Sequence, residues 1–142
     1  MQAGQVMQRN GSAKPPRTAS ILIVEDEALI ASYIREVLEE SGFTISGVAS
    51  TGVEALTLVG DCVPDLALVD IKLAGPMDGI EVATLIRSRF NVRSIFLTAV
   101  ADPEIINRAK DAAPLGYLEK PFRPSQVFNA LERALDQMAA SR

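Results

Sequence analysis

From residue 20 onward, short apolar runs alternate five times with segments whose apolar residues recur at helical spacing. The apolar runs are predicted as strands over residues 21–24, 44–49, 66–69, 94–98 and 116–118. The segments that follow them are predicted as helices over residues 28–41, 52–62, 78–90, 103–113 and 124–138. A regular alternation of strands and helices is typical of α/β proteins with a parallel sheet.

The first, third and fourth of these strands constrain the fold further, because they are continuously apolar rather than alternating. Continuous apolar runs are typical of parallel strands that helices cover on both faces. Five right-handed strand–helix units therefore predict a doubly wound α/β sandwich. The topology that fits is flavodoxin-like, a five-stranded parallel sheet in the order 2-1-3-4-5. Its switch point lies between strands 1 and 3, where such folds bind their ligands.

Helix start and stop signals support these ranges. Gly42 follows the first helix as a stop signal, and Pro64 lies just beyond the second. Asp102 is placed as the N-cap of the fourth helix, with Pro103 at its first helical position.

The length of 142 residues suits one domain with one core. We expect this folded domain over residues 20–139, followed by a short tail at 140–142. Residues 1–19 are rich in Gln, Gly, Ser, Pro and Ala and lack periodicity, so they are predicted to be a disordered tail. The three charges of this tail are all basic, which makes only a weak electrostatic anchor.

Composition narrows the function. The chain has no histidine, which removes the usual general base, the imidazole metal ligand and the phosphohistidine acceptor. A net charge of −4 argues against generic binding to nucleic acid or membrane surfaces. No transmembrane or secretory segment is apparent, so we expect a cytoplasmic protein. The single cysteine, Cys62, cannot form an internal disulfide and is predicted to be a small buried or half-buried residue.

Polar side chains follow four of the predicted strands. Glu25 and Asp26 follow the first strand and Asp70 follows the third, while Thr98 ends the fourth and Lys120 closely follows the fifth. The carboxyl ends of parallel strands meet at one edge of a sheet, so we expect these side chains to converge. Three neighbouring carboxylates repel one another unless a cation neutralises them. Oxygen ligands without histidine favour Mg²⁺ or Mn²⁺ over zinc.

A purely structural interpretation exists for part of this cluster. Glu25, Asp26 and Glu27 would also suit the N-terminal end of the following helix, where the helix dipole favours acidic residues. The additional carboxylate of Asp70 favours a cation site. An aspartate can be a nucleophile that forms an acyl phosphate, and the ammonium of Lys120 and the hydroxyl of Thr98 suit a phosphoryl group on it.

Five blocks of sequence in a fixed order match a known family. They lie at residues 21–27, 68–73, 77–81, 96–99 and 117–122. Over about residues 19–139 the chain resembles the receiver domains of two-component response regulators. The resemblance implies that Asp70 accepts a phosphoryl group from a histidine kinase or a histidine phosphotransfer protein. It also implies that Asp26 binds Mg²⁺ directly, that Glu25 does so through water, and that the backbone carbonyl of Lys72 is a further ligand.

The same resemblance implies a switch. Thr98 would move toward the phosphoryl oxygens and Tyr117 would swing inward, while the Lys120–Pro121 bond would be cis. Taken by itself, Tyr117 has a plain interpretation as a half-buried strand aromatic with its hydroxyl in solvent. The output surface of the family is the face made by the fourth helix, the fifth strand and the fifth helix, which an as yet unknown downstream protein would bind.

Three departures from the family pattern concern the neighbourhood of Asp70. The segment up to Gly79 is one residue longer than the common family loop, and Pro76 comes later than the usual proline. Lys72 stands where a neutral or amide side chain is frequent, and Glu25 replaces a more frequent aspartate. We hypothesise that a cation at Lys72 pairs with the acidic cluster, weakens Mg²⁺ affinity or shields the acyl phosphate from water.

Only residues 137–142 remain after the core of the last helix, which predicts a stand-alone receiver that is a monomer or a weak phosphorylation-dependent dimer. Such a protein is a phosphoacceptor and not an enzyme beyond its own phosphorylation and dephosphorylation. A receiver cut from a hybrid kinase or a larger regulator is one alternative. A phosphohydrolase of the haloacid dehalogenase kind is another, but it needs a second aspartate where this chain has Lys72.

Overall fold

The computed structural model describes residues 19–99 and 102–141. The strands are β1 (Ser20–Val24), β2 (Thr44–Ala49), β3 (Leu66–Asp70), β4 (Arg93–Thr98) and β5 (Gly116–Glu119). The helices are α1 (Ala28–Glu40), α2 (Gly52–Asp61), α3 (Gly79–Phe90), α4 (Pro103–Ala109), the 3₁₀ turn η2 (Lys110–Ala112) and α5 (Pro124–Ala140).

The strands form one parallel sheet in the order β2-β1-β3-β4-β5, which confirms the predicted flavodoxin-like topology. The central strand β3 pairs in continuous register with β1, from Ile21 opposite Leu66 to Val24 opposite Val69. Asp70, the last residue of β3, lies opposite Leu97 of β4. The carboxyl ends of β1, β3 and β4 therefore lie side by side at one edge of the sheet.

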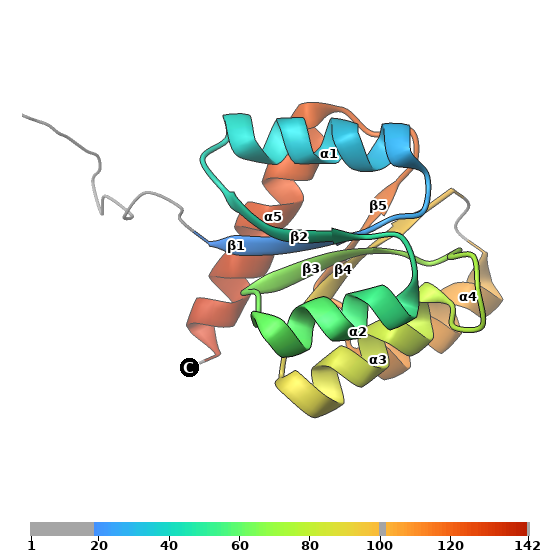
Figure 1. Cartoon of the computed structure of the whole chain (residues 1–142). Helices are drawn as coiled ribbons and strands as arrows, with labels where there is room; N and C mark the ends of the chain where they lie inside the picture. The colour runs from blue at the N-terminus through green and yellow to red at the C-terminus, as the bar shows by residue number, and fades with distance from the viewer. Residues whose placement is uncertain (1–18, 100–101, 142) are drawn as a thin grey trace, which may run out of the picture.

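Helices cover both faces of the sheet. In Figure 1, α1 and α5 lie on one face and α2, α3 and α4 on the other. Side chains of β1 alternate between the two layers, since Ile21 and Ile23 pack with α1 and α5 whereas Leu22 and Val24 pack with α2 and α3. This double burial is the reason why the strand is continuously apolar.

Capping residues mark the ends of three helices: those at Asp102 and Gly42 were predicted, whereas the cap at Asp78 was not. Asp78 begins α3 with a capping box, because its side chain accepts a hydrogen bond from the Glu81 amide at 2.9 Å and the Glu81 side chain accepts one from the Asp78 amide at 3.0 Å. Asp102 caps α4 through the Glu104 amide, with Pro103 at the first turn. Gly42, with a φ of 91°, follows α1 in the conformation that favours glycine.

Two elements differ from their predicted form. The fourth helix is α-helical only to Ala109, then tightens into η2, and ends where Ala113 adopts a left-handed conformation with φ 49°. Cys62 is exposed, which contradicts its predicted burial; α2 ends at Asp61 and the extended backbone at Cys62 takes it out of the helical pattern.

The predicted boundaries of the domain are only partly covered by the described residues. The last helix runs to Ala140, so this residue of the predicted 140–142 tail is helical. The predicted disordered tail, apart from Ala19, lies outside the described residues, as does Arg142. No helix in the described part of the chain has the length and hydropathy needed to cross a membrane.

Candidate functional site

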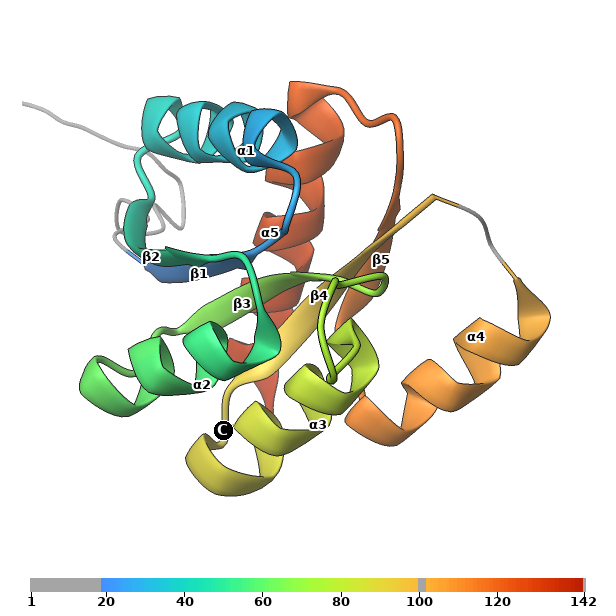
Figure 2. The ribbon, with the colours of Figure 1, turned by 45° about the vertical axis from the view of Figure 1, so that its right-hand side comes forward.

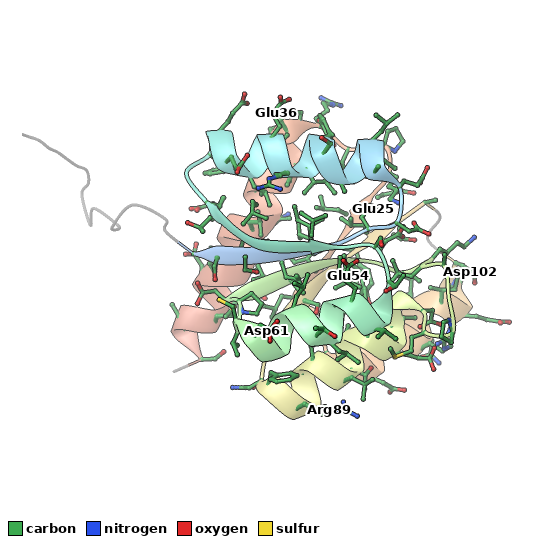
Figure 3. The ribbon with its side chains drawn as sticks, in the orientation of Figure 1. Glu25, Glu36, Glu54, Asp61, Arg89 and Asp102 are labelled. Atoms are coloured by element: carbon green, nitrogen blue, oxygen red, sulfur yellow. The ribbon has the colours of Figure 1, made fainter. Side chains whose placement is uncertain are left out.

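The predicted acidic cluster forms at the carboxyl ends of β1 and β3. Glu25 and Asp26 follow β1 directly, Asp70 ends β3, and each offers an oxygen within 4.8 Å of the others. Glu25 is 1% and Asp70 5% exposed, whereas Asp26 is open to solvent. Figure 3 shows Glu25 and Asp102 toward this end of the sheet, with Asp61 at the opposite end of α2.

Lys120 enters the cluster from the end of β5. Its ammonium nitrogen lies 2.9 Å from Glu25 Oε1 and 3.1 Å from Asp70 Oδ2. Its backbone amide donates to the carbonyl oxygen of Thr98 at 2.8 Å, which fixes the lysine beside the end of β4. Burial by itself would lower the pKa of Lys120, but the two carboxylates outweigh burial and the pKa is raised. Lys120 therefore stays protonated as the permanent counter-charge of the site.

Glu25 is a buried carboxyl group whose surroundings oppose its ionisation. Burial raises its pKa from the usual 4.5 to about 7, against the lowering effect of Lys120 and of the Glu27 amide, and Asp70 raises it further. Oε2 accepts the Glu27 amide at 3.1 Å, while Oε1 forms the ion pair with Lys120 at 2.9 Å. Three carboxylates with oxygens within 4.8 Å of one another, two of them buried, fit a divalent cation with oxygen ligands.

The loop after β3 is pinned to the cluster by its backbone. The amide of Lys72 donates to Asp70 Oδ1 at 3.1 Å, and the amide of Ala74 donates to Asp26 Oδ2 at 3.0 Å. At the far end of the loop, Gly79 donates to the Ile71 carbonyl at 2.8 Å. A Cβ atom at Gly79 would overlap the carbonyl oxygen of Asp70, so only glycine permits this approach. The loop that follows Asp70 therefore contacts both its side chain, through the Lys72 amide, and its backbone, through Gly79.

A cavity of about 460 Å³ opens above the cluster. It is lined by Asp26, Glu27, Asp70, Ile71, Lys72, Thr98, Ala99, Asp102, Ile105 and Lys120. Thr98 is buried at the end of β4. The side chain of Lys72 is exposed at the cavity wall, and the structure gives it no ion pair with any described residue. The hypothesised pairing of Lys72 with the acidic cluster is therefore absent from this arrangement.

Five lining residues were not identified from the sequence as part of the site. Three of them adjoin residues that were (Glu27, Ile71 and Ala99), whereas Asp102 and Ile105 do not. Asp102 was assigned only as a helix cap and Ile105 only as part of a helix. Their position in the sequence could have indicated this, because the segment that follows β4 must start at the same edge of the sheet as Asp70.

Tyr117 and the Lys120–Pro121 bond complete the predicted set. Tyr117 is an exposed aromatic of β5, with 38% of its surface accessible, and its ring centroid lies 6.1 Å from that of Phe96. It is therefore more exposed than the half-buried position of the plain interpretation. Burial raises the pKa of its hydroxyl. The Lys120–Pro121 bond is cis, as expected. The structure thus brings Glu25, Asp26, Asp70, Thr98 and Lys120 together and leaves Tyr117 outside the cavity lining.

The fold and site define an α/β protein with an acidic, lysine-paired pocket at the topological switch point of a parallel sheet. The family model described as the response regulator receiver domain matches residues 21–132, and the chain belongs to this family. Among solved structures, the signal receiver domain of a modulated diguanylate cyclase from Desulfovibrio desulfuricans superposes with a TM-score of 0.83 and 37% identity. That match covers 89% of this chain and 100% of the other.

Curated relatives are longer proteins. The transcriptional regulatory protein PdtaR of Mycobacterium tuberculosis is 39% identical over 117 residues, which are 82% of this chain and 57% of PdtaR. The phyllosphere-induced regulator PhyR of Methylorubrum extorquens is 35% identical over 116 residues, 81% of this chain and 43% of PhyR. The chain thus spans about half the length of these relatives.

Family membership fixes the class of function. Receiver domains are regulators rather than enzymes, which sets aside the phosphohydrolase alternative, and they work with a histidine kinase. The acidic triad of Glu25, Asp26 and Asp70 is typical of the Mg²⁺ site of receivers. The chain is therefore a two-component signalling domain.

Proposed function

We propose that this chain takes part in a phosphorelay by accepting a phosphoryl group on Asp70 from a histidine kinase or a histidine phosphotransfer protein. The observation that carries the proposal is the setting of the Asp70 carboxylate. One of its oxygens lies 3.1 Å from the Lys120 ammonium, the other accepts the Lys72 amide, and two further carboxylates lie within 4.8 Å.

In the transfer, a carboxylate oxygen of Asp70 forms a bond to phosphorus as the phosphorus–nitrogen bond to the donor histidine breaks. The electron pair of that bond stays on the imidazole, which takes up a proton. Lys120 holds positive charge beside the phosphoryl oxygens. Mg²⁺, or Mn²⁺ in its place, would be held by Glu25, Asp26, Asp70 and the Lys72 carbonyl, and would supply further positive charge for the phosphoryl group.

The donor is proposed to be a protein because an apolar groove adjoins the cavity. The groove has a volume of about 370 Å³ and includes Leu29, Tyr33 and Phe122, with Lys120 shared between groove and cavity. Leu29 is 87% exposed, which is unusual for a residue of its size and hydrophobicity. Exposed apolar surface next to a reactive site suits a docking protein partner.

Phosphorylation is proposed to shift the population of two arrangements of Thr98 and Tyr117. A downstream protein would then bind the face made by α4, β5 and α5 in one of them. We place this activity in the cytoplasm, where the receiver family usually works.

A larger regulator is the second candidate setting for this domain. Its support is that PdtaR and PhyR extend well beyond the matched region. The expectation of a stand-alone receiver stays a prediction, and the genomic open reading frame would decide between the two.

The test uses acetyl phosphate as a small phosphodonor with Mg²⁺ and intact-mass measurement as readout. We expect the wild type to gain one phosphoryl group and Asp70→Asn to gain none. Asp61→Asn, which removes an exposed carboxylate at the far end of α2, is the matched control and should be labelled like the wild type. Undiminished labelling of Asp70→Asn would disprove the assignment.

A further inference from the structure

Helix α4 is loosely attached to the rest of the domain. It is short, and Ala109 is its one fully buried residue, while Ile105 is partly buried against the core of α2 and α3. Pro103, Glu104, Asn107 and Arg108 are exposed. Figure 2 shows α4 at the margin of the molecule, beside α3. An element with so few buried apolar contacts opens or shifts at low free-energy cost.

One charged side chain of α4 reaches another element. The guanidinium of Arg108 donates to Asp78 Oδ2 at 2.9 Å. The other oxygen of the same carboxylate, Oδ1, accepts the Glu81 amide and caps α3. Asp78 therefore holds α4 and the start of α3 with one side chain, at the end of the loop that follows Asp70.

The beginning of this loop is bonded to the candidate site. The Lys72 amide donates to Asp70 Oδ1 and the Ala74 amide donates to Asp26 Oδ2. The segment 71–78 therefore has backbone contacts with the phosphoacceptor and a candidate metal ligand at one end, and a side-chain contact with α4 at the other.

We infer that the Asp78–Arg108 ion pair couples the chemical state of Asp70 and Asp26 to the position of α4, with Arg108 as a positioning residue. This inference rests on the proposed function. An acyl phosphate turns one carboxylate oxygen of Asp70 into a bridging anhydride oxygen and the other into a neutral carbonyl oxygen, and both are weaker acceptors for a backbone amide than a carboxylate oxygen. The loop anchors then change strength, and the ion pair transmits the change to a helix that little else holds. Coupling of this kind is reciprocal, so a partner that holds α4 also changes events at Asp70.

The first experiment needs no phosphorylation. Amide hydrogen exchange is compared between the wild type, Arg108→Ala, Arg108→Lys and Lys110→Ala in Mg²⁺-free buffer. We expect Arg108→Ala to speed exchange about two- to fivefold both in α4 and in residues 72–78, the range that exposed ion pairs support. Arg108→Lys should restore part of the protection. Lys110→Ala removes an equal charge from η2 and should leave the loop unchanged. Faster exchange in α4 alone would overturn the link between loop and helix.

The second experiment adds acetyl phosphate and Mg²⁺. We expect phosphorylation of the wild type to change exchange in α4, and at least half of this change to be lost in Arg108→Ala and in Asp78→Asn. The asparagine keeps an oxygen that can cap α3, so folding is preserved. The fraction of chains phosphorylated, measured by intact mass, is matched between variants. An α4 response in Arg108→Ala as large as in the wild type would overturn the inference.

The two experiments separate this inference from the proposed function. A wild type that takes no label from acetyl phosphate would contradict the proposed function, while the exchange of residues 72–78 in Arg108→Ala would still test the static link. A labelled wild type whose α4 response is also lost in Lys110→Ala would contradict the ion pair as the cause and leave Asp70 as the acceptor.

Discussion

Lys72 is a second lysine near the three carboxylates, in addition to Lys120, which is ion-paired with two of them. Its ammonium is exposed at the cavity wall, while its backbone is fixed by the hydrogen bond to Asp70. A solvated charge several ångströms from a divalent cation repels it by about 0.5 kcal/mol per unit charge or somewhat more. For the two charges of Mg²⁺ this amounts to about 1 kcal/mol, so we expect Lys72→Ala to bind Mg²⁺ about fivefold more tightly in a calorimetric titration at low salt. Lys110→Ala is the control, and equal tightening in both variants would show that only net charge matters.

Glu25 makes the stability of the metal-free protein depend on pH. Its pKa is about 7 in the folded state against a usual 4.5, so the folded state holds this proton more tightly than the unfolded chain. The stability from this group is complete below about pH 4.5 and is lost as pH rises toward and through 7. In EDTA, we expect the advantage of Glu25→Gln over the wild type to grow over this window, by up to about 3 kcal/mol. Urea unfolding at each pH measures it.

The control for this titration is Glu36→Gln, which removes a carboxylate from the exposed side of α1 (Figure 3). Its stability relative to the wild type should not follow the same curve between pH 4.5 and 7. A pH-independent difference between Glu25→Gln and the wild type would show that the buried carboxylate is ionised throughout.

At the scale of elements, the turn from the loop into α3 depends on one close approach. Gly79 lies against the backbone of Asp70, where a Cβ atom would overlap the carbonyl oxygen. We expect Gly79→Ala to destabilise the domain by at least about 2 kcal/mol, because the backbone and not a flexible side chain must move. Gly60→Ala is the matched control, since nothing lies within 4 Å of its Cβ position in α2. This change should stabilise by about 0.5–1 kcal/mol in urea unfolding.

The sequence predicts best the strands that helices cover on both faces of the sheet. Strands β1, β3 and β4 were evident because each contains an uninterrupted apolar run, and Asp102 with Pro103 fixed the start of α4. The tightening of its last turn into η2 was not evident, because the residues Lys110–Ala112 carry no local signal for a 3₁₀ turn. Cys62 was misplaced for a similar reason: its exposure depends on α2 stopping one residue earlier.

At the scale of the whole molecule, the sheet topology explains why the residues of the site could be predicted, whereas the contacts that surround the site could not. Parallel order brings every strand end to one edge, so Glu25, Asp70 and Thr98 follow from topology. The bond from Ala74 to Asp26 and the ion pair from Arg108 to Asp78 join residues far apart in the chain, and they depend on the exact path of one loop. Helical and strand periodicity carries no information about such a path.

The cluster also links the stability of the whole domain to Mg²⁺. Three carboxylates within 4.8 Å of one another repel, and among the described residues Lys120 alone forms ion pairs with them, so the metal-free domain is less stable than its core permits. We expect Asp26→Asn to be more stable than the wild type in EDTA, since one repelling charge is removed. At Mg²⁺ concentrations about a hundredfold above Kd, the wild type should gain about 2.7 kcal/mol. Asp26→Asn should gain much less, so the order of stabilities reverses.

Thermal unfolding in EDTA and in a Mg²⁺ series at constant ionic strength measures both effects. The asparagine still offers an oxygen to the Ala74 amide, so the loop keeps its anchor and the comparison isolates the charge. Equal stabilisation of both proteins by Mg²⁺ would mean that the ion binds elsewhere. A wild type that is already the more stable protein in EDTA would mean that Lys120 outweighs the repulsion between the carboxylates, so that the cluster needs no metal ion to be neutralised.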